Sequence, residues 1–257
     1  MSAGMEITMK QTDIINPFQP YMTLEMDGYS QINRTDYGIS HFYEFTIHDE
    51  KKHCIQAVPD ASIDLLFNIG ENKVSTYISG TVFGVKKWEL GTQDDCFGVR
   101  FQPGQGILPK DITMEMIVND DIEIDGDIFG KNLTEKIALA KTMSERIEIF
   151  KKAYEDMVLG RNSLSDKEKI NEYLVNRISR TKGMITMRQL EDETNYSACY
   201  LRRIFKSFHG ISPKQFAQYI RFQNLLMQAD KEGVRYEQVA LDCGYYDEPN
   251  MIKEFKN

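Results

Sequence analysis

The spacing of apolar residues changes near Phe129, and this change constrains the fold more than any other feature of the chain. Before Phe129, short runs alternate apolar and polar residues, which is the period of a strand with one buried face. These runs are ISHFYEFTI (39–47), SIDLLFNIG (62–70), KVSTYISG (73–80), VKKWEL (85–90), CFGVRFQP (96–103) and MEMIV (114–118). After Phe129, apolar residues recur every three or four positions, as in amphipathic helices. The sequence therefore predicts an α+β protein with two domains, in which strands precede helices.

Residues 1–160 are expected to form the first domain, a cupin-like β-barrel or β-sandwich with trailing helices at 129–159. Many short strands separated by glycine-containing turns are typical of such folds. The trailing helices carry an apolar stripe, and TMSE at 142–145 has the form of a capping box. The stripe comprises Met143, Ile147, Phe150, Tyr154 and Met157. It is expected either to pack on its own domain or to form the seam of a homodimer.

Residues 161–257 differ from the rest in charge and are expected to form a second, all-helical domain. They contain 16 Lys and Arg against 13 Asp and Glu, which leaves 15 against 26 for residues 1–160 of a chain with net charge -8. No acidic residue lies between Asn195 and Ala229, whereas five basic residues do. The acidity of the chain therefore belongs to the first domain, and it does not exclude an anionic partner for the second.

The stretch SACYLRRIFKSF at 197–208 has the pattern of a helix with one apolar and one basic face. Leu201, Ile204, Phe205 and Phe208 lie at i, i+3, i+4 and i+7, on one side, and the opposite side holds Cys199, Arg202, Arg203 and Lys206. Upstream, Asn195 tolerates the left-handed backbone of a tight turn. The sequence therefore predicts a helix, a turn and a second helix with an exposed basic face. The alternative is an ordinary solvated helix face.

The same plan recurs at the end of the chain. VALDCGYYDEPNMIKEFK (239–256) parallels LEDETNYSACYLRRIFK (190–206), with Gly244 in the place of Asn195. Between the copies, Ser-Pro at 212–213 is expected to begin a helix that runs to about residue 230. Such a helix spans roughly 26 Å, which suits two reading helices placed about one DNA turn apart. A repeat of this kind favours a pair of DNA-reading units.

These motifs resemble the double helix-turn-helix DNA-binding domain of the AraC family of bacterial transcription regulators. The span YLRRIFKSFHGISPKQFAQYIRF (200–222) and the second copy carry the family's features in order. The resemblance implies that the partner is double-stranded DNA, and it implies contact with RNA polymerase. It assigns DNA binding to Ser197, Cys199, Arg202, Arg203, Lys206 and Lys214 in the first unit, and to Glu248, Pro249 and Lys253 in the second. Residues 1 to about 155 resemble, more loosely, the sensing domain of some members, which implies a small-molecule effector.

Some positions depart from the family's pattern. Glu191 stands where the family has a small alanine, Glu254 stands in an apolar place, and Glu248 is an acid at a DNA-facing position. The second copy reaches Asn257 without the Gly-x-Ser-Pro and the last helix that follow it in the family. The segment from 247 to 257 is therefore expected to fray.

The first unit is accordingly expected to supply most of the DNA affinity. The resemblance places Lys253 and Arg203 at corresponding kinds of position in the two units. Because the second unit lacks the helix that would close its apolar group, Lys253→Ala is expected to cost less affinity than Arg203→Ala.

Two other functions are alternatives to a small-molecule-controlled regulator. One is a cupin-like metal-dependent enzyme, but the chain has no His-x-His pair and no CxxC pair. We therefore expect no catalysis, no metal and no cofactor. The other is a regulator controlled by a protein partner. No apolar run approaches the ~18 to 20 residues of a membrane span and no secretion signal opens the chain, so a cytoplasmic protein without membrane contact is expected.

The first domain is rich in aromatic side chains that are candidates for an effector pocket. Those in and near its longest strand-like run are His41, Phe42, Tyr43, Phe45 and, further along, Trp88. Large rings of this kind usually belong to the core, so each is expected there first and in a pocket second.

Overall fold

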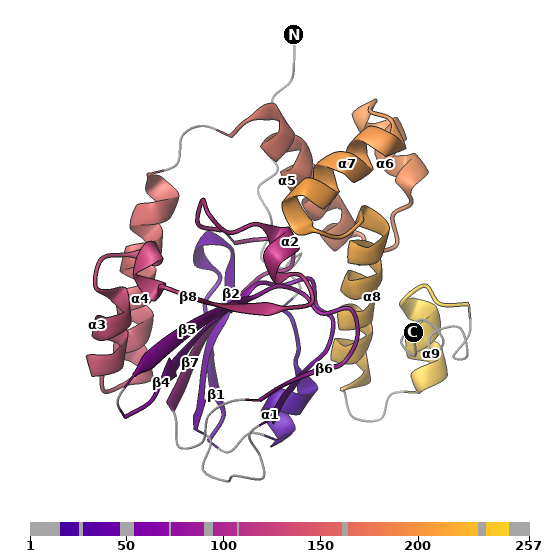
Figure 1. Ribbon diagram of the computed structural model, residues 1–257. Helices are drawn as coiled ribbons and strands as arrows, with labels where there is room; N and C mark the ends of the chain where they lie inside the picture. Colours follow the sequence, from indigo (N-terminus) through magenta and orange to yellow (C-terminus); the bar gives the residue numbers. More distant parts are fainter. Residues whose placement is uncertain are drawn as a thin grey trace.

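The computed structural model describes residues 16–25, 28–46, 54–71, 73–89, 95–106, 108–160, 164–230 and 235–246. Within these residues, a strand-rich part is followed by a helical part, as the change in apolar spacing predicted (Figure 1). The α+β fold class is therefore confirmed. None of the described helices is long and apolar enough to cross a membrane.

A six-stranded antiparallel sheet forms the body of the first part, in the order β1-β2-β7-β4-β5-β8. Its strands are β1 (Ser30–Asn33), β2 (Ile39–Thr46), β4 (Asp64–Ile69), β5 (Val74–Ser79), β7 (Asp95–Phe101) and β8 (Asp121–Ile124). A separate antiparallel pair consists of β3 (Cys54–Ala57) and β6 (Lys86–Glu89), and two 3-10 turns are η2 (Asp36–Gly38) and η3 (Gly126–Phe129). The register of β4 and β7 places Asp64 directly opposite Arg100.

One face of the sheet is apolar and packs against α3 (Leu133–Leu139) and α4 (Met143–Leu159) (Figure 1). Phe42 and Phe97 stack on this face, and Phe150 of α4 meets Phe42 edge-on with ring centroids 5.9 Å apart. The capping box predicted at the start of α4 is confirmed, because Glu145 N donates to Thr142 Oγ1 at 3.2 Å. These contacts make the sheet and the trailing helices one packed unit.

The apolar stripe of α4 belongs to this core. Met143, Ile147, Phe150 and Tyr154 are buried, and Met157 packs against the same cluster. The stripe therefore packs within its own domain, as the first alternative predicted. It does not form a dimer interface, which would need these side chains at the surface. Homodimerisation stays a prediction without an assigned surface.

The opposite face of the sheet carries polar side chains, because successive strand residues point to opposite faces. Asp64, Asn68, Tyr77, Ser79 and Arg100 share this face. Residues of α1 (Pro20–Glu25) and of the chain after β3 lie across it. A cavity lies between them.

The run MEMIV, predicted as a strand over 114–118, was wrongly assigned and forms the short helix α2 (Met114–Ile117). Met114 and Ile117 are three residues apart and both buried, as on one face of a helical turn. Val118 N donates to Met114 O at 2.8 Å and closes that turn. In so short an apolar run, strand and helix periods are not distinguishable. The strand that pairs with β5 lies just downstream, at β8.

The second part contains α5 (Asp166–Arg180), α6 (Met187–Thr194), α7 (Ala198–His209), α8 (Pro213–Ala229) and α9 (Tyr236–Asp242). Leu174, Leu201, Phe205 and Phe216 are among the fully buried side chains at its centre. The domain boundary predicted between residues 160 and 161 adjoins 161–163, which lie outside the described residues, and it stays a prediction.

The two parts lie side by side (Figure 1). Small residues lie at their contact. Ala61 of the first part belongs to the core cluster of α5, α7 and α8. A Cβ atom added to Gly104 would lie 3.0 Å from Val175 of α5 and 3.1 Å from Phe216 of α8. One added to Gly210, at the end of α7, would lie 2.7 Å from Val118. The sheet part therefore holds the α5–α8 bundle in direct contact.

Candidate nucleic-acid interface and candidate pocket

The α6–α7 pair forms a tight helical corner with specific caps at the turn. Asn195 ends α6 in the left-handed conformation, with φ of 56°, as predicted. Ser197 begins α7, where its Oγ accepts from Tyr200 N at 3.4 Å. Gly210 then ends α7 at φ 67°. The left-handed turn predicted at Asn195 is thus confirmed, and Ser197 and Gly210 fix the two ends of α7.

The apolar face of α7 is buried against its neighbours. Leu201 and Phe205 are fully buried and Ile204 is 3% exposed. The Phe205 ring meets Phe216 of α8 edge-on, with centroids 5.2 Å apart. This packing fixes the rotation of α7, so that its other face is held toward solvent.

The basic face of α7 is exposed, as predicted. Six of the residues assigned to DNA binding are exposed here: Ser197, Cys199, Arg202, Arg203, Lys206 and, at the start of α8, Lys214. Among the residues that the structure describes, none forms an ion pair with the four basic side chains, Arg202, Arg203, Lys206 and Lys214. The guanidinium of Arg203 lies 5.3 Å from the centre of the Tyr200 ring, a cation–π contact that limits its motion. The positive charge of this face is therefore available to an anionic partner.

Glu191, the acidic departure noted in the sequence, has a structural role at the corner. Its Oε1 accepts a hydrogen bond from Ala198 N at 2.6 Å. A carboxylate at the first turn of a helix satisfies a free backbone N–H and interacts favourably with the helix dipole. Glu191 therefore acts with Ser197 as a cap of α7.

Glu191→Ala is expected to lower the free energy of unfolding by about 1 kcal/mol, because this cap is lost. Urea denaturation of the full chain measures it. Asp192→Ala is the matched control, since Asp192 is the next residue and is exposed. Equal effects of the two substitutions would show that the bond to Ala198 contributes nothing specific.

The second unit repeats the corner as far as it is described. Gly244 follows α9 with φ of 80°, in the place that Asn195 has after α6. α9 packs on α8 through a small buried cluster: Leu225, Val239, Ala240, Cys243 and Tyr245. Glu248, Pro249 and Lys253, and the fraying predicted for 247–257, lie outside the described residues and stay predictions.

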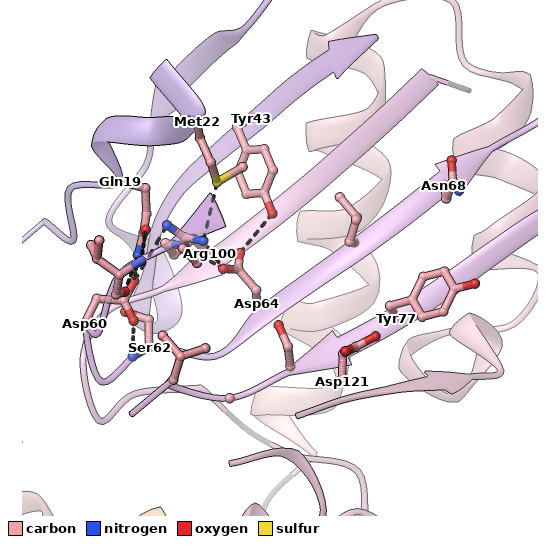
Figure 2. Close-up of a pocket in the computed structure, with 16 residues that line it drawn as sticks. Gln19, Met22, Tyr43, Asp60, Ser62, Asp64, Asn68, Tyr77, Arg100 and Asp121 are labelled. Atoms are coloured by element: carbon pink, nitrogen blue, oxygen red, sulfur yellow. Dashed lines mark hydrogen bonds and ion pairs between the residues drawn. The ribbon is translucent and has the colours of Figure 1, made fainter. Parts of the chain in front are cut away.

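A cavity of about 160 Å³ lies in the first part, on the polar face of the sheet (Figure 2). Of the aromatic candidates, Tyr43 lines it. Phe42 lies in the main core and Phe45 packs with Met22, while His41 is buried. The side chain of Trp88 lies outside the described residues.

One wall of the cavity is a buried ion cluster centred on Arg100 (Figure 2). Arg100 Nε donates to Asp64 Oδ2 at 2.7 Å, and its Nη1 lies 3.6 Å from Asp60 Oδ2. Tyr43 donates to Asp64 Oδ1 at 3.1 Å. Burial raises the pKa of Asp60 above its usual value, against the opposing effect of the Arg100 charge. Burial lowers the pKa of Arg100, but Asp64 and Asp60 outweigh it, so that the pKa of Arg100 is raised and the group stays cationic.

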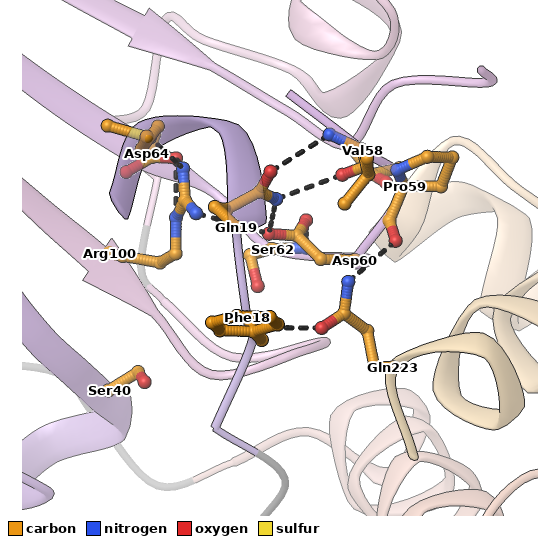
Figure 3. A network of polar contacts seen from close by, with 12 residues as sticks. Phe18, Gln19, Ser40, Val58, Pro59, Asp60, Ser62, Asp64, Arg100 and Gln223 are labelled. Atoms are coloured by element: carbon orange, nitrogen blue, oxygen red, sulfur yellow. Dashed lines mark hydrogen bonds and ion pairs between the residues drawn. The ribbon is translucent and has the colours of Figure 1, made fainter. Parts of the chain in front are cut away.

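A chain of hydrogen bonds joins this cluster to α8 (Figure 3). Gln223 of α8 is fully buried, donates to Pro59 O at 2.9 Å and accepts from Phe18 N at 2.7 Å. Gln19, which follows Phe18, is bonded to Asp60, which follows Pro59. Gln19 Nε2 donates to Asp60 Oδ2 at 2.7 Å. Three segments that are distant in sequence therefore meet between the cavity and the second part.

Two family models match separate parts of the sequence. One is described as a helix-turn-helix domain and matches residues 190–257. The chain carries an AraC-type helix-turn-helix domain. The other is a domain of unknown function (DUF6597), which matches residues 37–123, the region of the sheet and the cavity.

Among solved structures, the chain is similar to ToxT from Vibrio cholerae. One ToxT structure has 12% identity and a TM-score of 0.41, and the match covers 84% of this chain and 92% of that chain. Apo ToxT in a variant form has 14% identity and a TM-score of 0.44, covering 87% and 94%. ToxT with a bound unsaturated fatty acid has 12% identity and a TM-score of 0.41, covering 88% and 93%. No curated protein matches the chain.

The predicted DNA-binding residues of the first unit lie along α7 and at the start of α8. The cavity, in contrast, is lined or supported by residues that the sequence did not indicate. Arg100, Asp60 and Gln223 were not singled out. A signal existed for Arg100, a charged residue inside an otherwise apolar strand run. No group of three or more His, Cys, Asp or Glu side chains placed to hold a metal occurs among the described residues.

Proposed function

We propose that this chain is a sequence-specific transcription regulator that reads duplex DNA with α7 and responds to a small molecule bound in the cavity. The observation that carries the proposal is the exposed basic face of α7 behind a tight helical corner. The major groove admits an α-helix, and Arg side chains on such a helix bind guanine O6 and N7 with two hydrogen bonds. Phosphate contacts from other basic residues position the helix.

The proposed roles follow the position of each residue. Arg202 and Arg203 read bases, Ser197 and Cys199 lie nearest the groove floor at the start of α7, and Lys206 and Lys214 contact phosphates. Glu248, Pro249 and Lys253 are assigned to the next groove by the family resemblance alone. Contact with RNA polymerase rests on the same resemblance. α8 has 17 residues, about 26 Å, which is compatible with two reading units on one face of DNA.

Selection from random duplex DNA with the full chain tests the proposal. The expected result is enrichment of one sequence that contains guanine within the half-site bound by the first unit. Retention of DNA without enrichment of any sequence would contradict sequence-specific reading and would leave only general attraction to phosphate.

Arg203→Ala is expected to weaken binding to the selected site by about 1–3 kcal/mol and to relax the preference at one base pair. Lys214→Ala is expected to weaken selected and scrambled duplexes alike and to reduce the salt dependence by about one phosphate contact. Titrations of both variants with both duplexes at several salt concentrations measure these effects. Losses that are equal and independent of sequence would contradict base reading by Arg203.

We also propose that Gln223 transmits the state of the cavity to the DNA-binding part. It is bonded to Pro59 and to the backbone of Phe18, and the neighbours of both belong to the cavity wall. A ligand that alters the contacts of Asp60 or Gln19 therefore shifts the groups that hold α8. Physical contiguity supports coupling, and a double-mutant cycle measures it.

The cycle combines Asp60→Asn with Gln223→Leu and uses DNA affinity as its readout. Each single variant is expected to change affinity, and the double variant to differ from the sum of the two by about 0.5–3 kcal/mol. Glu123→Gln replaces Asp60→Asn in the control cycle, since Glu123 is exposed and paired with Lys73. Additivity within about 0.5 kcal/mol in both cycles would contradict transmission through Gln223.

A further inference from the structure

The cavity has a size and a charge that select among ligands. Its described lining contains three carboxyl groups, those of Asp60, Asp64 and Asp121, and one guanidinium, that of Arg100. The volume is about 160 Å³, close to the ~150 Å³ of an engineered cavity that holds a single benzene molecule. The ligand is therefore compact, and it enters a site in which negative groups outnumber positive ones.

The one guanidinium is already occupied. Arg100 donates to Asp64 at 2.7 Å, lies 3.6 Å from Asp60 and also contacts Met22 Sδ at 3.8 Å. Its guanidinium carbon lies 5.7 Å from the centre of the Tyr43 ring. A carboxylate ligand would have to displace Asp60 or Asp64 from this cluster, leaving a buried carboxylate without a cation. The site thus disfavours anionic ligands.

The other end of the cavity lies away from Arg100 and holds Asn68, Tyr77 and Asp121 (Figure 2). Ser79 on β5 is directly opposite Asp121 on β8, so that a carboxyl and a hydroxyl flank the same position. Leu66 and Val82 add apolar surface to the lining of the cavity. Carboxylate, amide and hydroxyl oxygens together with a tyrosine ring are groups that attract an ammonium.

Ser62 gives an independent indication that the cavity receives a polar ligand. Its Oγ is buried without a hydrogen-bond partner among the described residues, and Ser62 lines the cavity. The residue is 4% exposed. A buried hydroxyl without a partner is unfavourable, and a polar atom of a ligand would satisfy it.

We propose that the effector is a compact amine whose ammonium lies at the Asp121 end of the cavity, whose short apolar body lies along Leu66 and Val82, and whose second polar group bonds to Ser62. This inference rests on the proposed function, in which the cavity is the effector site. It names the chemical class of the ligand: a cation of about six to ten heavy atoms, the size that a benzene-sized cavity accepts.

Three probes that differ at one end only test this class: 4-amino-1-butanol, 1,4-butanediol and 4-hydroxybutyrate. Their binding to the full chain is measured by isothermal titration calorimetry at neutral pH and low salt. The amine is expected to bind at least about tenfold more tightly than the diol, because its ammonium gains a charged hydrogen bond. The carboxylate is expected to bind most weakly. Absence of amine binding, equal affinities, or tightest binding of the carboxylate would overturn the proposal.

Substitutions in the lining locate the bound amine. Asp121→Asn is expected to weaken amine binding about tenfold and to leave diol binding unchanged. Glu123→Gln is the matched control, because Glu123 lies two residues along β8, is exposed, pairs with Lys73 and does not line the cavity. Ser62→Ala is expected to weaken the amine and the diol alike. Unchanged amine affinity in both Asp121→Asn and Ser62→Ala would place the ligand elsewhere and overturn the proposal.

Failure of the ligand class and failure of the proposed function give different results. Selection of a DNA sequence together with tightest binding of 4-hydroxybutyrate would overturn the amine and leave DNA reading intact. Tight binding of 4-amino-1-butanol that requires Asp121, without selection of any DNA sequence, supports the amine and contradicts the proposed function.

Discussion

Arg100→Met is expected to lower the free energy of unfolding by about 3–5 kcal/mol, the cost of breaking a buried ion cluster by removing one partner. Arg100 is 3% exposed and Asp60 is 4% exposed, so water screens little of the charge left behind. Without the guanidinium, Asp60 and Asp64 lose the cation with which both are paired. Met keeps much of the side-chain volume, so the loss reports charge and hydrogen bonding more than packing.

The pH dependence of this loss gives a second readout. Removing the positive charge raises the pKa of Asp60 further, beyond the increase that burial already causes. The folded protein then holds protons that the unfolded chain releases, so the penalty grows as pH rises above about 4 and is small below it. Urea denaturation at pH 4 and pH 7 measures both effects.

Two controls identify the cause. Adding Asp60→Asn and Asp64→Asn to Arg100→Met is expected to recover part of the loss, since the unpaired charges are gone. Lys73→Met, which breaks the exposed pair with Glu123, is expected to leave the free energy of unfolding nearly unchanged, because water and salt screen such a pair. A loss below about 1 kcal/mol for Arg100→Met would contradict a cluster held together by that guanidinium.

Acid is expected to destabilise the helix-turn-helix domain through His209. The ring is buried, its Nε2 donates to Asn171 Oδ1 at 2.8 Å, and it packs 4.3 Å from the centre of the Phe205 ring. Burial lowers the pKa of His209 from 6.5 to about 3. Between these two pKa values, His209 is protonated in the unfolded chain and neutral in the folded protein. Stability is complete above about pH 6.5 and falls as the pH drops toward 3.

Between pH 7 and pH 5 this single group is expected to remove about 2 kcal/mol of stability. His209→Gln keeps an N–H donor for Asn171 and does not titrate, so the variant is expected to lose about 2 kcal/mol less over the same interval. His41, whose pKa burial lowers to about 3, stays in both proteins and cancels in the comparison. Identical pH dependence of the two proteins would contradict a neutral, buried His209.

Local sequence signals were sufficient for the helical part because its structure depends on nearby residues. Asn195 indicated the turn after α6, where the backbone is left-handed. Ser212 before Pro213 indicated the start of α8. The apolar spacing within α7 identified which face is buried. Helix caps and helix faces are determined within about four residues, so one sequence contains the information.

The cavity was not predictable in the same way, because it is assembled from distant segments. Arg100 and Asp64 are 36 residues apart, and Gln223 is 164 residues from Pro59 and 205 from Phe18. Strand alternation shows that residues share a face, but not which strands are neighbours. The strand assignment at 114–118 failed for a different reason: an apolar run of five residues is too short to distinguish the strand period from the helix period.

Guanine N7-methylation interference tests base reading by α7 most directly, because a methyl group at N7 blocks the acceptor that Arg uses. The measurement compares the wild-type chain with Arg203→Ala on the DNA site selected by the wild-type chain. The predicted result is interference at a guanine in the wild-type complex that disappears, at that position alone, in the Arg203→Ala complex. An unchanged interference pattern in the variant would contradict contact between Arg203 and a base.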